Sequence, residues 1–444
     1  MSHDEQNPPA NDQPGTAHEE QALADLLQFP FVDALFGRRS RRFFLGAEIP
    51  DGPIAFKSRH KPVPLTELEK LLILTAVGGN TGWHHAITRH DRYAPHLSNY
   101  AGSASGRTFP SAAGFHTSEI FFTDDSGTYI FKTRDNPPPV PHAEDGSIST
   151  VDLVKAHRSQ IHKISDKRIY LPAKEPYLEG HNTWVANRPG SLLIIPTGDL
   201  AQHTIANICF YVQNGFSIYD DINHRRIPGI EQYANIVDIE NPYPLTFLDQ
   251  YSLNECTAEL STAAYAGALM QQALGLGGWM FDGIDRLSIL GASGDPDVPG
   301  LGFRYDTDER WSLPNPTGLD GVFESYTPPH YADMRAAVDK FCERKFGLGG
   351  PFNPATPGPW KDSSKVRSSA LVHDERFREV VALQAQYMYD TFGKFPATVP
   401  SVQILMYLQT HHLDLEYYDT LFEPGAYLKT HAEHFTKWHQ PEQG

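Results

Sequence analysis

The segment that most constrains the fold is residues 254–278, which are rich in small residues and poor in charged ones. Alanine and glycine recur between Ala258 and Ala273, and the segment ends in Leu-Gly-Leu-Gly-Gly. Glycine commonly ends a helix in the left-handed conformation, so this ending predicts a helix stop. A helix with so few charges is buried on nearly all sides. We therefore expect a long helix that packs closely against backbone, and a subunit interface is one place for it.

The composition suits a large folded chain that avoids polyanions. The 444 residues are 40% hydrophobic and 20% charged, enough for one large core with an extension or for two domains. The formal net charge of −17 argues against nucleic acid or an anionic membrane surface as the principal partner, because both would repel the chain. A local basic cluster is then expected to bind a small anion and not a polymer.

Cysteine usage and the N-terminal residues indicate a compartment. Cys209, Cys256 and Cys342 lie far apart without disulfide or metal-type spacing, which fits a reducing cytoplasm. Residues 1–25 are acidic and polar without an apolar run, so we expect a disordered tail and no signal peptide. No stretch reaches the ~18 apolar residues of a membrane span. The sequence predicts a soluble, cytoplasmic protein with no membrane partner.

Local signals predict several helices and strands. Thr66 and an acidic first turn open a helix over residues 65–76, which Gly78 and Gly79 stop. Two apolar runs around Asp-Asp-Ser-Gly predict a β-hairpin at residues 118–123 and 128–133. Further strands are expected at residues 192–196, 208–212 and 287–290. Further helices are expected at residues 332–346 and 374–392, and in pieces over residues 402–439.

A basic cluster at residues 38–42 stands out in this acidic chain. It reads Arg-Arg-Ser-Arg-Arg between two phenylalanines. Guanidinium groups and a hydroxyl together can hold a phosphate by bidentate, charge-assisted hydrogen bonds. Taken alone, such a short basic run is more often a solvated turn or pairs with an acidic surface.

Four segments in order resemble the FMN-dependent nitroreductase superfamily. They are residues 38–42, the helix at residues 65–76, the segment Pro110-Ser-Ala-Ala-Gly-Phe-His-Thr-Ser-Glu119, and the stretch from Glu259 to Asp285. The third segment is similar to the branch whose dehydrogenases oxidise azolines in modified peptides. The resemblance covers roughly residues 30–305. It implies an α+β fold with an antiparallel-dominated sheet flanked by helices, built as an intertwined homodimer with FMN between subunits.

The resemblance implies a domain plan and a cofactor site. An FMN-binding domain would span residues 26–305, and a mostly helical extension would span residues 306–444. The positions that hold the FMN phosphate and ribityl chain match Arg38, Arg39, Ser40 and Arg42. The segment along the pyrimidine side of the flavin matches Pro110 and Ser111. The turn and loop that approach the flavin near N5 match Gly275, Gly277, Asp282 and Gly283, where glycine permits close backbone contact.

The implied activity is hydride transfer between flavin N5 and a small-molecule or peptide-derived substrate, as a dehydrogenase or oxidase. Because the flavin performs this chemistry, no catalytic acid–base pair is assigned. Two alternatives stay open. One is an NAD(P)H-dependent reductase of nitroaromatics or quinones, with NAD(P)H as a transient co-substrate. The other is a non-catalytic flavoprotein-like scaffold or partner-binding subunit.

Three details stay open in the sequence. Asn80, in Gly-Gly-Asn-Thr-Gly-Trp, competes with Ser111 as the nearer flavin contact. Arg304 and Arg310 are candidates for the basic residue that completes the phosphate site. The tail carries histidines at 411, 412, 431, 434 and 439, some at metal-type spacing, but without an HExxH pattern. We expect these histidines to pack among the tail aromatics, with no metal bound.

Overall fold

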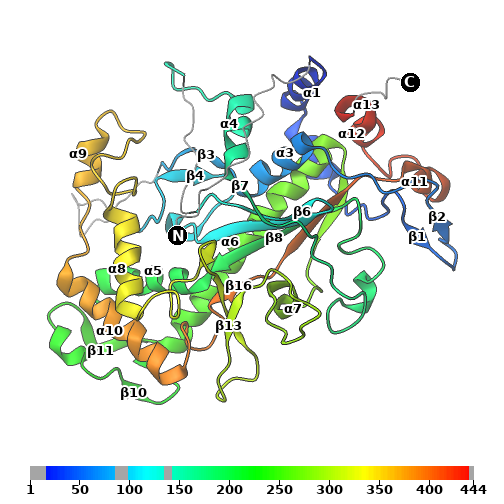
Figure 1. The fold of residues 1–444 in the computed structure, drawn as a ribbon. Helices are drawn as coiled ribbons and strands as arrows, with labels where there is room; N and C mark the ends of the chain where they lie inside the picture. The colour runs from blue at the N-terminus through cyan, green and yellow to red at the C-terminus, as the bar shows by residue number, and fades with distance from the viewer. Residues whose placement is uncertain (1–16, 86–98, 135–142, 440–444) are drawn as a thin grey trace, which may run out of the picture.

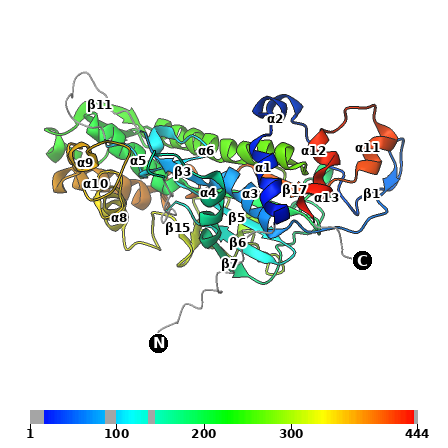
Figure 2. The same cartoon turned by 90° about the horizontal axis from the view of Figure 1, so that it is seen from above.

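The structure is a computed structural model that describes residues 17–85, 99–134 and 143–439. It shows an α+β chain in which an antiparallel sheet is flanked by helices (Figures 1 and 2). This arrangement confirms the fold class expected from the sequence. Among these residues, no helix combines the length and the apolar character needed to cross a membrane.

The secondary structure is dominated by helices in number of residues, with mostly short strands between them. The helices are α1 (Ala17–Leu27), α2 (Phe31–Gly37), α3 (Glu67–Gly78), α4 (Thr150–Ala156), α5 (Leu200–Gln213), α6 (Leu245–Leu274), α7 (Arg286–Leu290), α8 (Met334–Phe346), α9 (Ser363–Ser368), α10 (Glu375–Phe392), α11 (Leu415–Leu421), α12 (Lys429–Ala432) and α13 (His434–Trp438). The strands are β1 (Glu48–Ile49), β2 (Phe56–Lys57), β3 (Asn80–Trp83), β4 (Ser105–Arg107), β5 (Ser118–Asp124), β6 (Gly127–Phe131), β7 (Ile161–Ser165), β8 (Leu192–Asp199), β9 (Phe216–Asp220), β10 (Arg225–Arg226), β11 (Asp238–Pro244), β12 (Gly277–Phe281), β13 (Arg304–Asp306), β14 (Asn315–Leu319), β15 (Phe323–Glu324), β16 (Val402–Gln403) and β17 (Tyr407–His411).

The central sheet has seven strands within the described residues, in the order β12-β17-β8-β5-β6-β7, with β16 also beside β8. All its neighbouring strands run antiparallel. The predicted hairpin is confirmed as β5 and β6, with Asp124 opposite Gly127. Side chains alternate across β5, so Phe121 enters the core on one face while Ile120 and Phe122 enter the core on the other.

Helices α3 and α6 cover one face of this sheet. Thr66 caps α3 as predicted, and its backbone N–H in turn donates to the Glu69 carboxylate. The predicted long helix is confirmed as α6, although it begins earlier, at Leu245, and ends before Gly275. A Cβ on Gly267 would lie 2.5 Å from side-chain atoms of Val77 and Leu408. The small residues of α6 therefore let it fit between α3 and the sheet.

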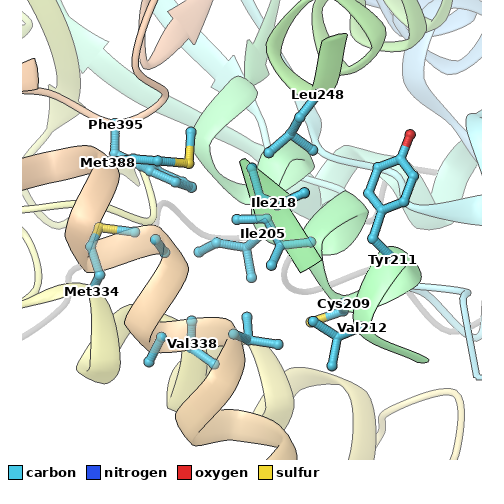
Figure 3. Packing of buried hydrophobic residues seen from close by; sticks show 14 of the residues in the cluster. Ile205, Cys209, Tyr211, Val212, Ile218, Leu248, Met334, Val338, Met388 and Phe395 are labelled. Atoms are coloured by element: carbon cyan, nitrogen blue, oxygen red, sulfur yellow. The ribbon is translucent and has the colours of Figure 1, made fainter. Parts of the chain in front are cut away.

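A second core lies beside the sheet, where α5, α8 and α10 pack together. Figure 3 shows Ile205 of α5, Val338 of α8 and Met388 of α10 gathered in one apolar cluster. The structure confirms α8 and α10 where the sequence predicted helices, and each ends at a glycine. The cluster also includes Leu245 and Leu248, so it packs α5, α8 and α10 against the N-terminal half of α6.

Two strand predictions are wrong. Residues 208–212 lie in α5, and residues 287–290 lie in α7. A short apolar run fits a buried helix as well as a strand. An aspartate cap favours the helix in both places: Asp199 accepts from the Gln202 N–H, and Asp285 accepts from the Ser288 N–H.

The ends of the chain also depart from expectation. Residues 17–27 form α1, which packs on α13, where disorder was expected; residues 1–16 of the expected tail lie outside the described residues. The C-terminal region does carry a helical extension, but β16 and β17 occupy residues expected to be helical. Because β17 pairs with both β8 and β12, this region completes the central sheet. The domain boundary near residue 305 stays a prediction.

Candidate functional site

The arginine cluster (residues 38–42) follows α2 and lies against the C-terminal end of α6. Arg41 anchors it, because the buried guanidinium donates from Nη1 to Gln272 Oε1 at 2.7 Å and from Nε to the Ala426 carbonyl at 2.9 Å. The Arg41 carbonyl accepts from the Gly278 N–H at 2.8 Å. Arg41 therefore has a structural role: its hydrogen bonds hold the cluster against α6, β12 and the C-terminal tail.

The remaining side chains of the cluster differ in how they are engaged. Arg38 and Arg42 have no acidic partner among the described residues, and Ser40 is exposed. The Arg42 guanidinium lies 5.0 Å from the centroid of the Trp279 ring, a contact that orients the cation without neutralising it. Arg39 donates from Nη1 to two carbonyls of its own segment, at 2.8 and 3.0 Å. Arg38 and Arg42 thus carry positive charge with no acidic partner among the described residues, beside the exposed Ser40.

At the glycines after α6, where a flavin was expected to lie close to the backbone, other residues of this chain make the close contact. A Cβ on Gly277 would lie 2.1 Å from the Leu413 side chain, and a Cβ on Gly278 would lie 1.9 Å from the Gln409 carbonyl. Gly275 ends α6 with a φ of +79°. The close approach predicted at Gly277 is therefore made by residues in and after β17, which the sequence did not indicate.

Asp282 and Gly283 lie at the other end of β12 from Gly277. Asp282 lies five positions after Gly277, about 16 Å along a strand at ~3.3 Å per residue. Gly283 has a φ of +80°, and its carbonyl accepts from the Glu179 N–H at 2.9 Å. The Asp282 side chain is exposed.

The Pro110–Ser111 segment is fastened to the middle of α6 by one buried carboxylate. Ser111 Oγ donates to Glu259 Oε2 at 2.5 Å. Glu259 Oε1 accepts from the backbone N–H groups of Thr117 and Ser118, both at 3.0 Å. A carboxylate with several N–H and O–H donors is a strong orienting group in a protein interior. The sequence places Glu259 at the start of the fourth segment of the resemblance, but it does not indicate a contact with Ser111, because 148 residues separate them.

Pro110 and Ser111 line a cavity of about 400 Å³. Its other lining residues include Trp83, His84, His85, Arg107 and His116. Burial lowers the pKa of His84, helped by the charges of His85 and Arg107, and burial places the pKa of His116 well below its ordinary value. Both rings are therefore neutral at pH 7. His116 Nδ1 is buried and has no hydrogen-bond partner among the described residues.

Sequence reasoning missed the histidines of this cavity as site residues. Their spacing carries no motif, and only the fold brings His84 against the Pro110 segment. A Cβ on Gly114 would lie 2.4 Å from His84 Cε1, so the glycine of the Pro-Ser-small-small-Gly pattern admits that ring. His90 and His96, which lie in the same polar stretch, fall outside the described residues.

The rival contact Asn80 lies nearby but faces a different space. It begins β3, which pairs with β4, and it lines a second cavity of about 740 Å³. Trp83 of the same strand lines both cavities. The charged residues that line the larger cavity are four cations, Lys132, Arg134, Lys340 and Arg344, and two acids, Glu324 and Glu343.

The predicted site residues do not form one site in the chain: two groups join α6, and Asp282 and Gly283 lie at the far end of β12 from Gly277. Gly277 adjoins the arginine cluster, whereas Ser111 joins α6 at Glu259. Arg41 joins α6 at Gln272, thirteen residues further along, which is about 20 Å at ~1.5 Å per residue. The late arginines do not complete either group: Arg304 pairs with Asp320 and Arg310 with Asp308.

Comparisons with known proteins add little. No family model matches the chain, and no curated protein matches it. Among solved structures, the chain is similar to a candidate nitroreductase from Ralstonia eutropha JMP134, at 12% identity and a TM-score of 0.27. That similarity covers 58% of this chain and 72% of the other. A likeness at this level carries no argument, so the proposals that follow rest on the residues themselves.

Proposed function

We propose that this chain binds FMN and transfers a hydride between flavin N5 and a small-molecule or peptide-derived substrate, as a dehydrogenase or oxidase. One observation carries the proposal: within the part of the chain that the structure describes, Arg38 and Arg42 lack acidic partners beside the exposed Ser40, although the chain has a net charge of −17. Cations left unpaired in an acidic protein attract an anion, and guanidinium groups suit a phosphate through bidentate bonds. The resemblance seen in the sequence names FMN as that phosphate ester.

The two groups of site residues fit FMN if two copies of the chain combine. One copy would supply the arginine cluster, and the other would supply the Pro110–Ser111 pocket. Helix α2 exposes apolar side chains, with Phe31 65% and Phe36 73% exposed, and it packs on α6. The half-exposed positions of α6 from Thr257 to Ala273 carry no charge. A homodimer through α2 and α6 would bury this apolar surface.

In this proposal the residues of the chain bind and orient FMN, and the flavin carries out the hydride transfer. Bound FMN would supply the hydride donor or acceptor at N5. Arg38, Ser40 and Arg42 would hold the phosphate, and Arg39 would contribute mainly backbone. The Ser111 hydroxyl is held by Glu259, so it offers an oriented oxygen on the pyrimidine side. His84 and His116 add hydrogen-bonding atoms to the same pocket without adding positive charge.

The first test is the absorbance spectrum of the purified chain, with mass spectrometry of any molecule released on denaturation. A yellow protein that releases FMN is the expected result. A colourless protein that also fails to bind added FMN contradicts the proposal and favours the scaffold alternative. Bleaching of the yellow protein by NADPH or NADH would favour the reductase alternative, and resistance to both would favour the dehydrogenase.

The second test removes the unpaired cations. We expect Arg38→Ala with Arg42→Ala to lower FMN affinity at least a hundredfold while the fold survives, because both side chains lie at the surface of the cluster and Arg41 remains. Fluorescence titration with FMN measures the affinity. Arg304→Ala is the matched control, since it removes a surface arginine that is already paired with Asp320. Full flavin occupancy in the double variant would overturn the phosphate assignment.

A further inference from the structure

Four side chains from distant parts of the sequence meet beside the C-terminal end of α6. Glu69 lies in the first turn of α3, His412 follows β17, and His434 and His439 lie on and after α13. Their nearest nitrogen and carboxylate atoms all lie within 4.8 Å of one another. Glu69, His412 and His434 are almost fully buried, whereas His439 is half-buried and leaves a route from solvent.

The distances between these atoms suit a shared cation. His434 Nε2 lies 2.9 Å from Glu69 Oε1, and His439 Nε2 lies 3.3 Å from the same oxygen. His412 Nδ1 lies 3.0 Å from His434 Nε2. Around Zn²⁺, with bonds of about 2.0–2.1 Å, tetrahedral ligand atoms lie about 3.3–3.4 Å apart. The cluster therefore needs only small shifts to become a tetrahedral site.

The outer nitrogens show which ring atoms face the cluster without a hydrogen. His434 Nδ1 lies 2.8 Å from the Leu274 carbonyl, and His412 Nε2 lies 3.3 Å from the Pro64 carbonyl. A carbonyl only accepts, so either ring, when neutral, carries its hydrogen on the outer nitrogen. The two inner nitrogens then direct lone pairs at each other. A proton on His434 Nε2 could be shared with only one neighbouring acceptor at a time. A divalent cation could accept lone pairs from all four side chains at once.

Glu69 is oriented for the same role. Its Oε2 accepts from the Thr66 N–H at 2.6 Å in the capping box of α3, which leaves Oε1 for the histidines. Hydrogen bonds between the backbone and the far side of each ligand are a common way in which proteins orient a metal site. Three of the four ligands have such a bond here.

Two other clusters of possible ligands in the described part of the chain lack these properties. His60, Asp414 and Glu416 form one, and Asp320, Glu324 and His330 form the other. Each combines one histidine with two carboxylates and includes an exposed residue, and Glu416 is already paired with an arginine. Each contains only one histidine, so neither has the pair of facing imidazole nitrogens that distinguishes the histidine cluster.

We propose that Glu69, His412, His434 and His439 form a tetrahedral Zn²⁺ site that fastens the C-terminal tail to α3. Four protein ligands close the coordination shell, which is typical of a structural and not a catalytic zinc. The sequence predicted packing for the tail histidines, since they form no HExxH pattern and lie among aromatic residues. Their glutamate partner lies on α3, far earlier in the chain, so the sequence did not indicate the cluster. The tail so fastened also contacts the end of α6, where Thr430 Oγ1 donates to the Gln272 carbonyl at 2.6 Å.

The test uses the untagged, full-length chain, stripped with a chelator and dialysed. Calorimetric titration with ZnCl₂ should show one Zn²⁺ per chain, and added Zn²⁺ should raise the melting temperature because it binds only the folded state. Co²⁺ in place of Zn²⁺ should give the visible bands of four-coordinate Co²⁺. We expect His439→Gln to weaken Zn²⁺ binding at least tenfold; this ligand is partly exposed, so its loss leaves the fold intact. Glu433→Gln is the control, because that carboxylate pairs with Lys429 and Lys437 and should not affect binding.

Two results would overturn the site. One is a wild-type chain that takes up less than one Zn²⁺ per chain in the calorimeter. The other is a His439→Gln chain that binds Zn²⁺ as tightly as the wild type while its circular dichroism shows it folded. Either result would make the cluster a hydrogen-bonded network of histidine and glutamate without a metal. Neither result depends on whether the chain binds FMN.

Discussion

Lys345 places an ammonium group inside the core formed by α5, α8 and α10. It is 2% exposed, and among the described residues its ammonium group has one polar contact, the Tyr100 carbonyl at 3.5 Å. No acidic partner lies beside it among the described residues, although its charge lies 5.3 Å from the Phe341 ring. Burial lowers the pKa of Lys345 from 10.5 to about 8, which corresponds to about 3 kcal/mol. A single charged side chain thus costs stability at neutral pH.

We expect Lys345→Met to raise the free energy of unfolding by about 1–3 kcal/mol at pH 7. Between pH 8 and 10.5 the unfolded wild-type chain binds the proton and the folded chain does not, so wild-type stability rises with pH there. The advantage of the variant should therefore shrink over that range. Urea denaturation at several pH values measures it. Lys340→Met is the control: this exposed lysine is paired with Glu343, so its replacement should change the free energy of unfolding by less than about 0.5 kcal/mol. If the stability gained by Lys345→Met stayed constant with pH, that result would contradict the lowered pKa of Lys345.

The end of α6 shows how one helix terminus organises its surroundings. Gly275 has a φ of +79°, and a Cβ there would lie 2.1 Å from the Thr430 carbonyl of the tail. Two separate requirements therefore select glycine. The left-handed conformation costs other residues about 1–2 kcal/mol, and the tail leaves no space for a side chain. The same terminus supports the arginine cluster through Gln272 and Arg41.

We expect Gly275→Ala to lower the free energy of unfolding by about 2–4 kcal/mol, the sum of the conformational cost and the cost of displacing the tail. Gly294→Ala is the matched control, because Gly294 has a φ of +78° with open space where its Cβ would lie. It should cost only about 1–2 kcal/mol. Chemical denaturation of both variants provides the comparison. Equal losses would show that the contact with the tail adds nothing.

The whole molecule carries an apolar face, which the proposed homodimer would bury. Helix α2 exposes Phe31, Val32 and Phe36, and α2 and α6 lie together along one side of the chain (Figure 2). The two groups of site residues lie about 20 Å apart along α6 in one chain. A dimer through this face would therefore serve both stability and the cofactor site.

We expect Phe31→Glu with Phe36→Glu to convert a wild-type dimer into a monomer and to lower FMN occupancy with it. Charged side chains on both positions would make burial of this face unfavourable. Analytical ultracentrifugation measures the mass, and absorbance measures the flavin. Leu348→Glu is the control, since that leucine is 89% exposed on the loop after α8. A wild-type monomer that binds FMN fully would contradict the shared site.

The sequence predicted the elements whose signals are local. Thr66 and Glu69 sit three residues apart and start α3, and the turn before Gly127 sets the β5–β6 hairpin. Where the local signal was ambiguous, the prediction was wrong: the apolar run at residues 208–212 suits strand and helix alike, and burial against α8 and α10 made it helix. The roles of the individual cofactor-site residues stay predictions.

By itself the sequence determined the existence of α3 and the hairpin and the glycine stop of α6, and it determined that residues 38–42 concentrate positive charge in an acidic chain. These properties depend on neighbours within a few residues, so local physical chemistry suffices. Only the tertiary structure placed β17 between β8 and β12, bound Ser111 to Glu259, and brought Glu69 to the tail histidines. Each of these contacts joins residues more than a hundred positions apart. Their partners are chosen by packing of the whole chain, because no local pattern records which distant side chain will share a buried space.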